Sequence, residues 1–169
     1  MSDDVPRLVE PSQPLDPRAV GLWTAQSWLG TVGATLVPGV VAVVLLATGH
    51  RTPGLVFAAI AVVLAAAGAA FSLTWPPRYH ARYRWEVLPE GVVVARGWLW
   101  RTVQVVPHTR IQAVDSSSGP MERRAGLASV HLRTASREGS PHIPGLDAEV
   151  ARGLAARIAE AAGAEDDAT

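Results

Sequence analysis

The sequence predicts a membrane α-helical hairpin of two transmembrane helices, followed by a mainly β barrel or sandwich of five to seven antiparallel strands capped by a C-terminal α-helix. Three observations predict this fold class. Two long apolar runs lie in the first half of the chain, two-residue alternation of apolar side chains follows them, and an amphipathic helical pattern lies near the C-terminus.

The two apolar runs cover residues 28–48 and 54–75. At ~1.5 Å rise per residue, each is long enough to cross the ~30 Å hydrocarbon layer as a helix. Between Arg18 and Arg78 the only charged residue is Arg51. The alternative is a pair of buried core helices, which we disfavour because so small a protein could not surround two apolar helices of that length. Both runs are therefore predicted to span the membrane.

Positive charge predicts the orientation of this hairpin. Arg18 precedes the first run and Arg78, Arg82 and Arg84 follow the second, whereas the connecting loop offers only Arg51. The positive-inside rule then places both termini in the cytoplasm, in a multi-pass protein of the cell membrane. The aromatic residues predicted to anchor the same face in the interfacial layer are Trp23, Trp28, Trp75 and Tyr79.

Four segments follow from composition and charge. They are a disordered acidic tail over residues 1–15, an interfacial helix start with the hairpin over 16–77, the β-rich domain over 78–163, and a second disordered acidic tail over 164–169. Asp16 and Pro17 predict the start of the first helix, as N-cap and first helical residue. The formal net charge of zero hides a basic centre, because residues 78–144 hold ten arginines against five acidic residues.

Alternation after residue 82 predicts a β-hairpin over "YRWEVLPEGVVVARG", residues 83–97, with its turn at Pro89–Gly91. The further strand candidates are "WRTVQVVP", "IQAVDSS", "ASVHLRT" and "PHIPGL", with one helical turn at "GPMERRAG" between the second and third. The last element is an amphipathic helix with Asp147 as N-cap and its end at Gly163. Its apolar stripe contains Val150, Leu154 and Ile158 and must pack on the strands.

This order of elements, with "VPHTRIQAVDSSSGPMERRAGLASVHLRTA" and "IPGL", resembles the membrane-anchored bacterial pleckstrin-homology (PH) domain proteins, the YdbS-like family. The resemblance covers roughly residues 16–162 and implies a PH-like fold, membrane attachment and no known enzymatic activity. The family-motif positions are Pro107, Arg110, Ile111, Gln112, Gly119, Pro120, Gly126, Leu127 and Thr134. After Thr134 the family usually has an early glycine, whereas here the first is Gly139, so we expect this loop to differ.

No motif predicts a catalytic, cofactor or metal site. The absence of cysteine excludes thiolate ligands and cysteine nucleophiles. The five histidines lack the i,i+4 spacing and carboxylate partners of a zinc site, and neither a nucleophile elbow nor a dinucleotide fingerprint is present. We therefore expect no enzyme, no cofactor and no small-molecule substrate. No nucleic-acid-binding signature accompanies the basic centre.

Two functions stay open. The first is a non-enzymatic adaptor that binds a protein partner, either a related membrane PH protein or its own copies, by strand addition at an exposed sheet edge. The second is peripheral binding of anionic lipid headgroups, to which each arginine near the surface adds ~1 kcal/mol. The candidate lipid- or partner-binding residues are Arg96, Arg101, Arg110, Arg123 and Arg124, whose alternative is a solvated and partly paired surface. Membrane transport has the weakest support, because neither apolar run carries an ionisable residue.

Overall fold

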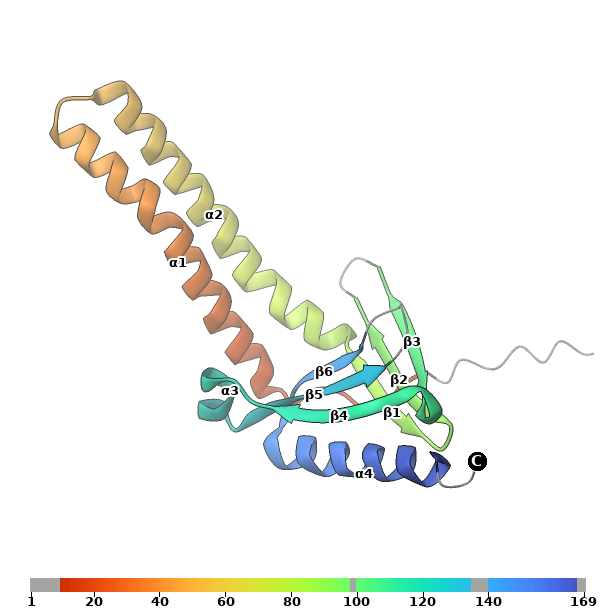
Figure 1. Ribbon diagram of the computed structural model, residues 1–169. Coiled ribbons are helices and arrows are strands. Elements are labelled where there is room, and N and C mark those ends of the chain that lie inside the picture. Colours follow the sequence, from red (N-terminus) through yellow and green to blue (C-terminus); the bar gives the residue numbers. More distant parts are fainter. Residues whose placement is uncertain (1–9, 98–99, 135–139, 167–169) are drawn as a thin grey trace, which may run out of the picture. The chain divides into compact units, whose positions relative to one another are not determined.

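The computed structural model describes residues 10–97, 100–134 and 140–166 (Figure 1). The chain divides after Ala19 and after Arg78 into two compact units. One unit is a helical hairpin. The other, the sandwich unit, is β-rich and is built from residues on both sides of the hairpin. The expected change in the loop leading to Gly139 lies outside the described residues.

The hairpin consists of α1 (Arg18–Ala47) and α2 (Arg51–Arg82). The second predicted span, 54–75, lies wholly within α2, and the first, 28–48, lies within α1 except for Thr48, because α1 ends at Ala47. Each helix is longer than its predicted span. The prediction ended the second span at Trp75, but α2 continues through Pro76 and Pro77 to Arg82. The fixed φ of proline is compatible with a helix, although each ring removes an amide hydrogen bond and crowds the carbonyl group four residues earlier.

The side chains of the hairpin are arranged for an apolar solvent. Only 6% of the most apolar 18-residue window is buried in each helix, and Val37 and Val62 are each 67% exposed. The helices approach closely at small residues. A Cβ added to Gly68 would clash with the side chain of Thr31, and Thr31 Oγ1 lies 3.5 Å from Ser72 Oγ. Small residues at the contact and apolar residues outside are typical of helices packed in lipid.

Two three-stranded antiparallel sheets form the sandwich unit, as the fold class predicted (Figure 1). Sheet A contains β1 (Arg84–Leu88), β2 (Gly91–Arg96) and β3 (Thr102–Pro107) in that order. The 3-10 turn η1 (His108–Arg110) leads to sheet B, which contains β4 (Ile111–Ser117), β5 (Leu127–Thr134) and β6 (His142–Asp147), with α3 (Pro120–Ala125) between β4 and β5. The predicted hairpin forms, with Leu88 opposite Gly91.

The core of the sandwich unit lies between the two sheets and under α4 (Ala148–Asp166), which contacts η1 and all three strands of sheet B. Leu154 and Ile158 are buried as predicted. Val150 is half exposed, so the buried stripe begins at Ala151 instead. The helix also ends three residues later than predicted, because a glycine such as Gly163 costs only ~1 kcal/mol inside a helix.

Residues 10–15 are not a disordered tail, so this prediction was wrong for them. Gln13 exchanges two backbone hydrogen bonds with Trp85 at the outer edge of β1, of 3.1 and 3.0 Å. Asp16 N then donates to Gly145 O of β6 at 3.0 Å, and Leu15 between them is 2% exposed. The segment joins one edge of sheet A to one edge of sheet B. The sequence suggested disorder because prolines and charges surround the single large apolar side chain, Leu15.

We expect Leu15→Ala to lower the free energy of unfolding of the sandwich unit by about 2–5 kcal/mol, as for other buried leucines. Val150→Ala, at a half-exposed position, is the control and should have a small effect. Denaturant unfolding of the full chain in detergent, followed by tryptophan fluorescence, measures both. Equal effects of the two substitutions would show that the segment does not stabilise the unit.

Candidate functional site

The five candidate arginines lie at three separate places in the sandwich unit. Arg96 ends β2 and Arg101 precedes β3, but their side chains alternate to opposite faces, because Arg96 is opposite Thr102 in the register. Arg110 lies in η1, beyond the other end of β3, and the six residues of β3 alone span about 20 Å at ~3.3 Å per residue. Arg123 and Arg124 are exposed on α3, which lies apart from β2 and β3 in Figure 1. The five do not form one patch.

Arg101 instead shares a surface cavity with arginines that the prediction did not include. We call this cavity the arginine hollow; it measures about 340 Å³ and is lined by Ala81, Arg82, Arg84 and Arg101. The sheet register explains the grouping. Arg84 is opposite Ala95, which is opposite Val103, and Arg101 precedes Val103 by two residues. All these side chains therefore share one face of sheet A.

Hydrogen bonds orient two of the guanidinium groups in the arginine hollow. Arg84 Nη1 donates to the carbonyl oxygens of Tyr83 at 2.7 Å and His80 at 3.3 Å. Arg101 Nη1 lies 3.0 Å from Glu10 Oε1, in an ion pair whose two side chains are 55% and 78% exposed. A pair this exposed contributes roughly 0–1 kcal/mol, so Glu10 is a weakly held anion at the rim.

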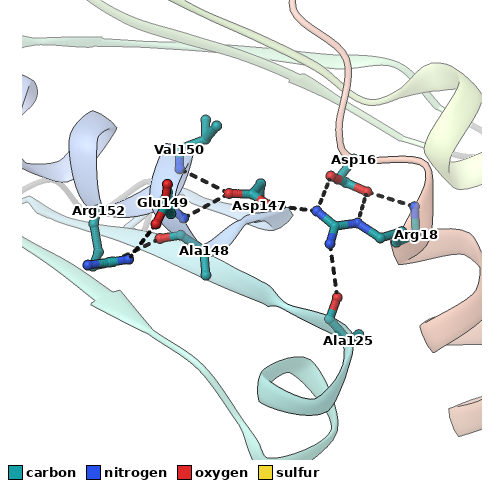
Figure 2. Close-up of polar contacts among 8 residues, drawn as sticks. All are labelled: Asp16, Arg18, Ala125, Asp147, Ala148, Glu149, Val150 and Arg152. Atoms are coloured by element: carbon teal, nitrogen blue, oxygen red, sulfur yellow. Dashed lines mark hydrogen bonds and ion pairs between the residues drawn. The ribbon is translucent and has the colours of Figure 1, made fainter.

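A second cluster of charges surrounds Arg18 (Figure 2). Its Nη2 donates to Asp16 Oδ2 at 2.8 Å and to Asp147 Oδ2 at 2.6 Å, while its Nη1 donates to Ala125 O at 3.3 Å. Asp147 Oδ1 accepts the backbone N–H of Glu149 at 2.9 Å and so caps α4, as predicted. Arg18 thus joins the start of α1, the end of α3 and the start of α4.

Arg18 lowers the pKa of both carboxyl groups. Its side-chain hydrogen bond is the largest cause for Asp16, opposed by partial burial, and also the largest for Asp147, where the backbone N–H groups of α4 add to it. The cluster was missed because only its local part, the Asp16 and Asp147 caps, can be recognised in a sequence.

The family-motif positions frame β4 at both ends. Before and at its start, Pro107 ends β3, Arg110 ends η1, and Ile111 and Gln112 are the first two residues of β4. After β4, Gly119 N donates to Glu122 Oε2 at 2.7 Å, and Glu122 Oε1 accepts the Ser129 hydroxyl at 2.8 Å. Gly126 ends α3 with φ +69°, a conformation that favours glycine, and Leu127 is fully buried. Pro120 starts α3 and Thr134 ends β5. Of these positions, Gly119, Gly126 and Leu127 have contacts or a backbone conformation that maintain the fold, whereas Arg110 and Gln112 are exposed.

Two histidines stack across β5 and β6. His131 and His142 are opposite in the register, with ring centroids 5.5 Å apart. Burial lowers the pKa of His142, and His131 and Arg96 lower it further, against a small opposite effect of Glu122. The buried Tyr83 hydroxyl donates to the His142 carbonyl, and burial raises the Tyr83 pKa. Among the described residues no group of three or more His, Asp or Glu gathers as metal ligands would.

The four edge strands of the two sheets differ in how they are protected. The segment with Gln13 and Asp16 covers β1 and β6. The edge strand β4 has a register irregularity and exposed polar residues, which discourage pairing. The described residues pair with β3 only on its β2 side. On β3, Val103 is 37% and Val105 is 51% exposed.

The predicted interfacial aromatics lie at the ends of the helices. Trp23 and Trp75 pack against each other with ring centroids 6.1 Å apart, so the start of α1 and the end of α2 meet at one end of the hairpin. Tyr79 packs against Tyr83 at 5.5 Å, and Trp28 is exposed. Their depth in the bilayer stays a prediction.

Two apolar helices joined to a six-stranded antiparallel sandwich define a membrane-anchored protein with a small β-rich domain. The family model described as a bacterial PH domain matches residues 28–162, and the chain belongs to this family. It is 27% identical to the transmembrane protein YdbS of Bacillus subtilis (strain 168) over 158 residues, which cover 94% of this chain and 97% of the relative. No solved structure matches the chain. The resemblance noted from the sequence and the PH-like fold class are confirmed.

We expect Arg18→Gln to lower the thermal stability of the sandwich unit at pH 7. The folded-state pKa values of Asp16 and Asp147 lie below their ordinary 3.8. Their stabilisation is therefore complete above about pH 5 and is lost as the pH falls below 4 through the folded-state values. The difference in melting temperature between the variant and the wild type should therefore become smaller as the pH falls through that acidic range. Arg152→Gln removes an exposed pair with Glu149 and is the control. A difference that is constant with pH would contradict the linkage.

Proposed function

We propose that this protein is a non-enzymatic adaptor of the cell membrane, whose PH domain binds a protein partner by accepting a β-strand at the outer edge of β3. The observation that supports this is the composition of that edge. Natural edge strands are usually protected by charges, proline or irregular register. Arg101 and Pro107 lie at the two ends of β3. The residues between them include no charge and no proline, and Val103 and Val105 are exposed.

The proposed partner is a strand from another membrane PH protein, and the simplest case is a second copy of this chain. Two β3 edges can pair antiparallel about a two-fold axis, which buries the same valines from both copies. Anchoring in one membrane raises the effective concentration of such a partner. Backbone hydrogen bonds then supply the affinity without a chemically specialised side chain.

The edge can be tested with Val103→Lys and Val105→Lys in the full chain in detergent, because a charge on the edge opposes strand addition. We expect each to weaken self-association about tenfold or more, measured by light scattering across a concentration series. Val150→Lys, at an exposed valine on α4, should leave association unchanged. If the purified chain is monomeric, a photocrosslinking residue introduced at Val103 should form an adduct with a related PH protein in native membranes. A wild-type chain that is monomeric, together with a Val103 crosslinker that forms no adduct, would refute the adaptor proposal.

We also propose that both termini lie in the cytoplasm. Arg18, Arg78 and Arg82 flank the open end of the hairpin, against Arg51 at its turn. A cysteine introduced at His50 should react with an impermeant maleimide added outside intact cells, and a cysteine introduced at Ser12 should not. Labelling at Ser12 but not at His50 would show that both termini lie outside the cytoplasm.

A further inference from the structure

The arginine hollow combines three cationic side chains with a cavity of ligand size. Its volume of about 340 Å³ falls in the roughly 300–1,000 Å³ range of small-molecule sites. Among the residues that the structure describes, the charged side chains that line it are those of Arg82, Arg84 and Arg101. Three guanidinium groups around one cavity favour an anion, because each presents a planar fork of N–H donors.

Arg84 is held in place before any ligand arrives. Its Nη1 is fixed by the carbonyl oxygens of Tyr83 and His80, while the guanidinium also carries Nε–H and Nη2 donors. A side chain oriented in this way loses less conformational freedom on binding than a solvated arginine does. Its remaining donors match the spacing of two phosphate oxygens.

Glu10 already acts as an internal anion at this site. Its carboxylate accepts from Arg101 Nη1 at 3.0 Å, yet the Glu10 side chain is 78% exposed. A phosphate group carries more acceptor oxygens than a carboxylate and can contact several arginines together. It would therefore displace Glu10 from Arg101 at little cost.

The chain keeps the hollow close to the membrane surface. Trp75 ends the apolar run of α2, and Arg82 follows seven residues later. Even a fully extended chain of that length spans only about 25 Å. Phospholipid headgroups at the end of the helix are therefore within reach of the arginine hollow, as are soluble phosphate esters.

We propose that Arg82, Arg84 and Arg101 bind a phosphate group, with Glu10 as its internal competitor. This site does not depend on strand addition at β3. It takes the place of the five candidate arginines named from the sequence, which do not form one patch. Screening by salt weakens the binding, since the groups are partly exposed.

Native mass spectrometry of the full chain in detergent, titrated with phosphatidylglycerol or phosphatidylcholine, tests the proposal. We expect phosphatidylglycerol, whose headgroup is anionic, to bind in preference to phosphatidylcholine. Arg84→Gln and Arg101→Gln should each weaken its binding about fivefold, and Arg133→Gln, at an exposed arginine of sheet B, should not. Glu10→Gln should strengthen binding up to about fivefold, a gain that misfolding cannot produce.

Competition with inorganic phosphate distinguishes the two sources of the ligand. Displacement of bound phosphatidylglycerol by inorganic phosphate would indicate a site that also accepts soluble phosphates, and the absence of displacement would indicate a headgroup site. Equal binding by Arg84→Gln, Arg101→Gln and Arg133→Gln would overturn the proposal, as would weaker binding by Glu10→Gln. The Val103→Lys variant should retain phosphatidylglycerol, so the failure of the adaptor proposal would be recognised separately.

Discussion

The sandwich unit depends on closure of its sheet edges by the segment that precedes the membrane hairpin. Two three-stranded sheets have four edges, and unpaired backbone groups there must find partners. Gln13 pairs with β1, Asp16 donates to β6, and Leu15 is buried between them. Because this segment leads directly into α1, the chain that enters the hairpin is itself a structural part of the PH domain.

Arg18 extends this closure to the helices of the sandwich unit. Its separate contacts are exposed and individually weak, but one guanidinium fork holds two carboxylates and a backbone carbonyl together. Asp147 has two roles, since one of its oxygens caps α4 and the other accepts from Arg18. The start of α4 is thereby joined to the residues that begin α1, although the two are far apart in sequence.

Local patterns predicted the helices, the strands and the order of elements, because alternation and capping are properties of neighbouring residues. The packing of Leu15 and the contacts of Arg18 with Asp147 could not be predicted, since both join distant segments. The arginine hollow lies between these cases. The sequence predicted the strands that carry Arg84 and Arg101, but their approach required the registers of both strand pairs, which place Arg84 opposite Ala95 and Ala95 opposite Val103. The second span was ended at Trp75 because the apolar run stops there, whereas α2 continues to Arg82.

The proposed strand-binding edge and the arginine hollow share one face of sheet A. Arg84, Val103 and Val105 lie on this face, and the central strand β2 is buried beneath it at Val93 and Ala95. Arg101 is two residues from Val103, so a strand added to β3 would pass beside the hollow. A phosphate bound there would neutralise positive charge that the incoming strand meets. Any effect of the anion on strand affinity must be matched by an equal effect of the strand on anion affinity. If both proposals hold, the PH domain responds to the charge of its own membrane through the face that is proposed to accept the partner strand.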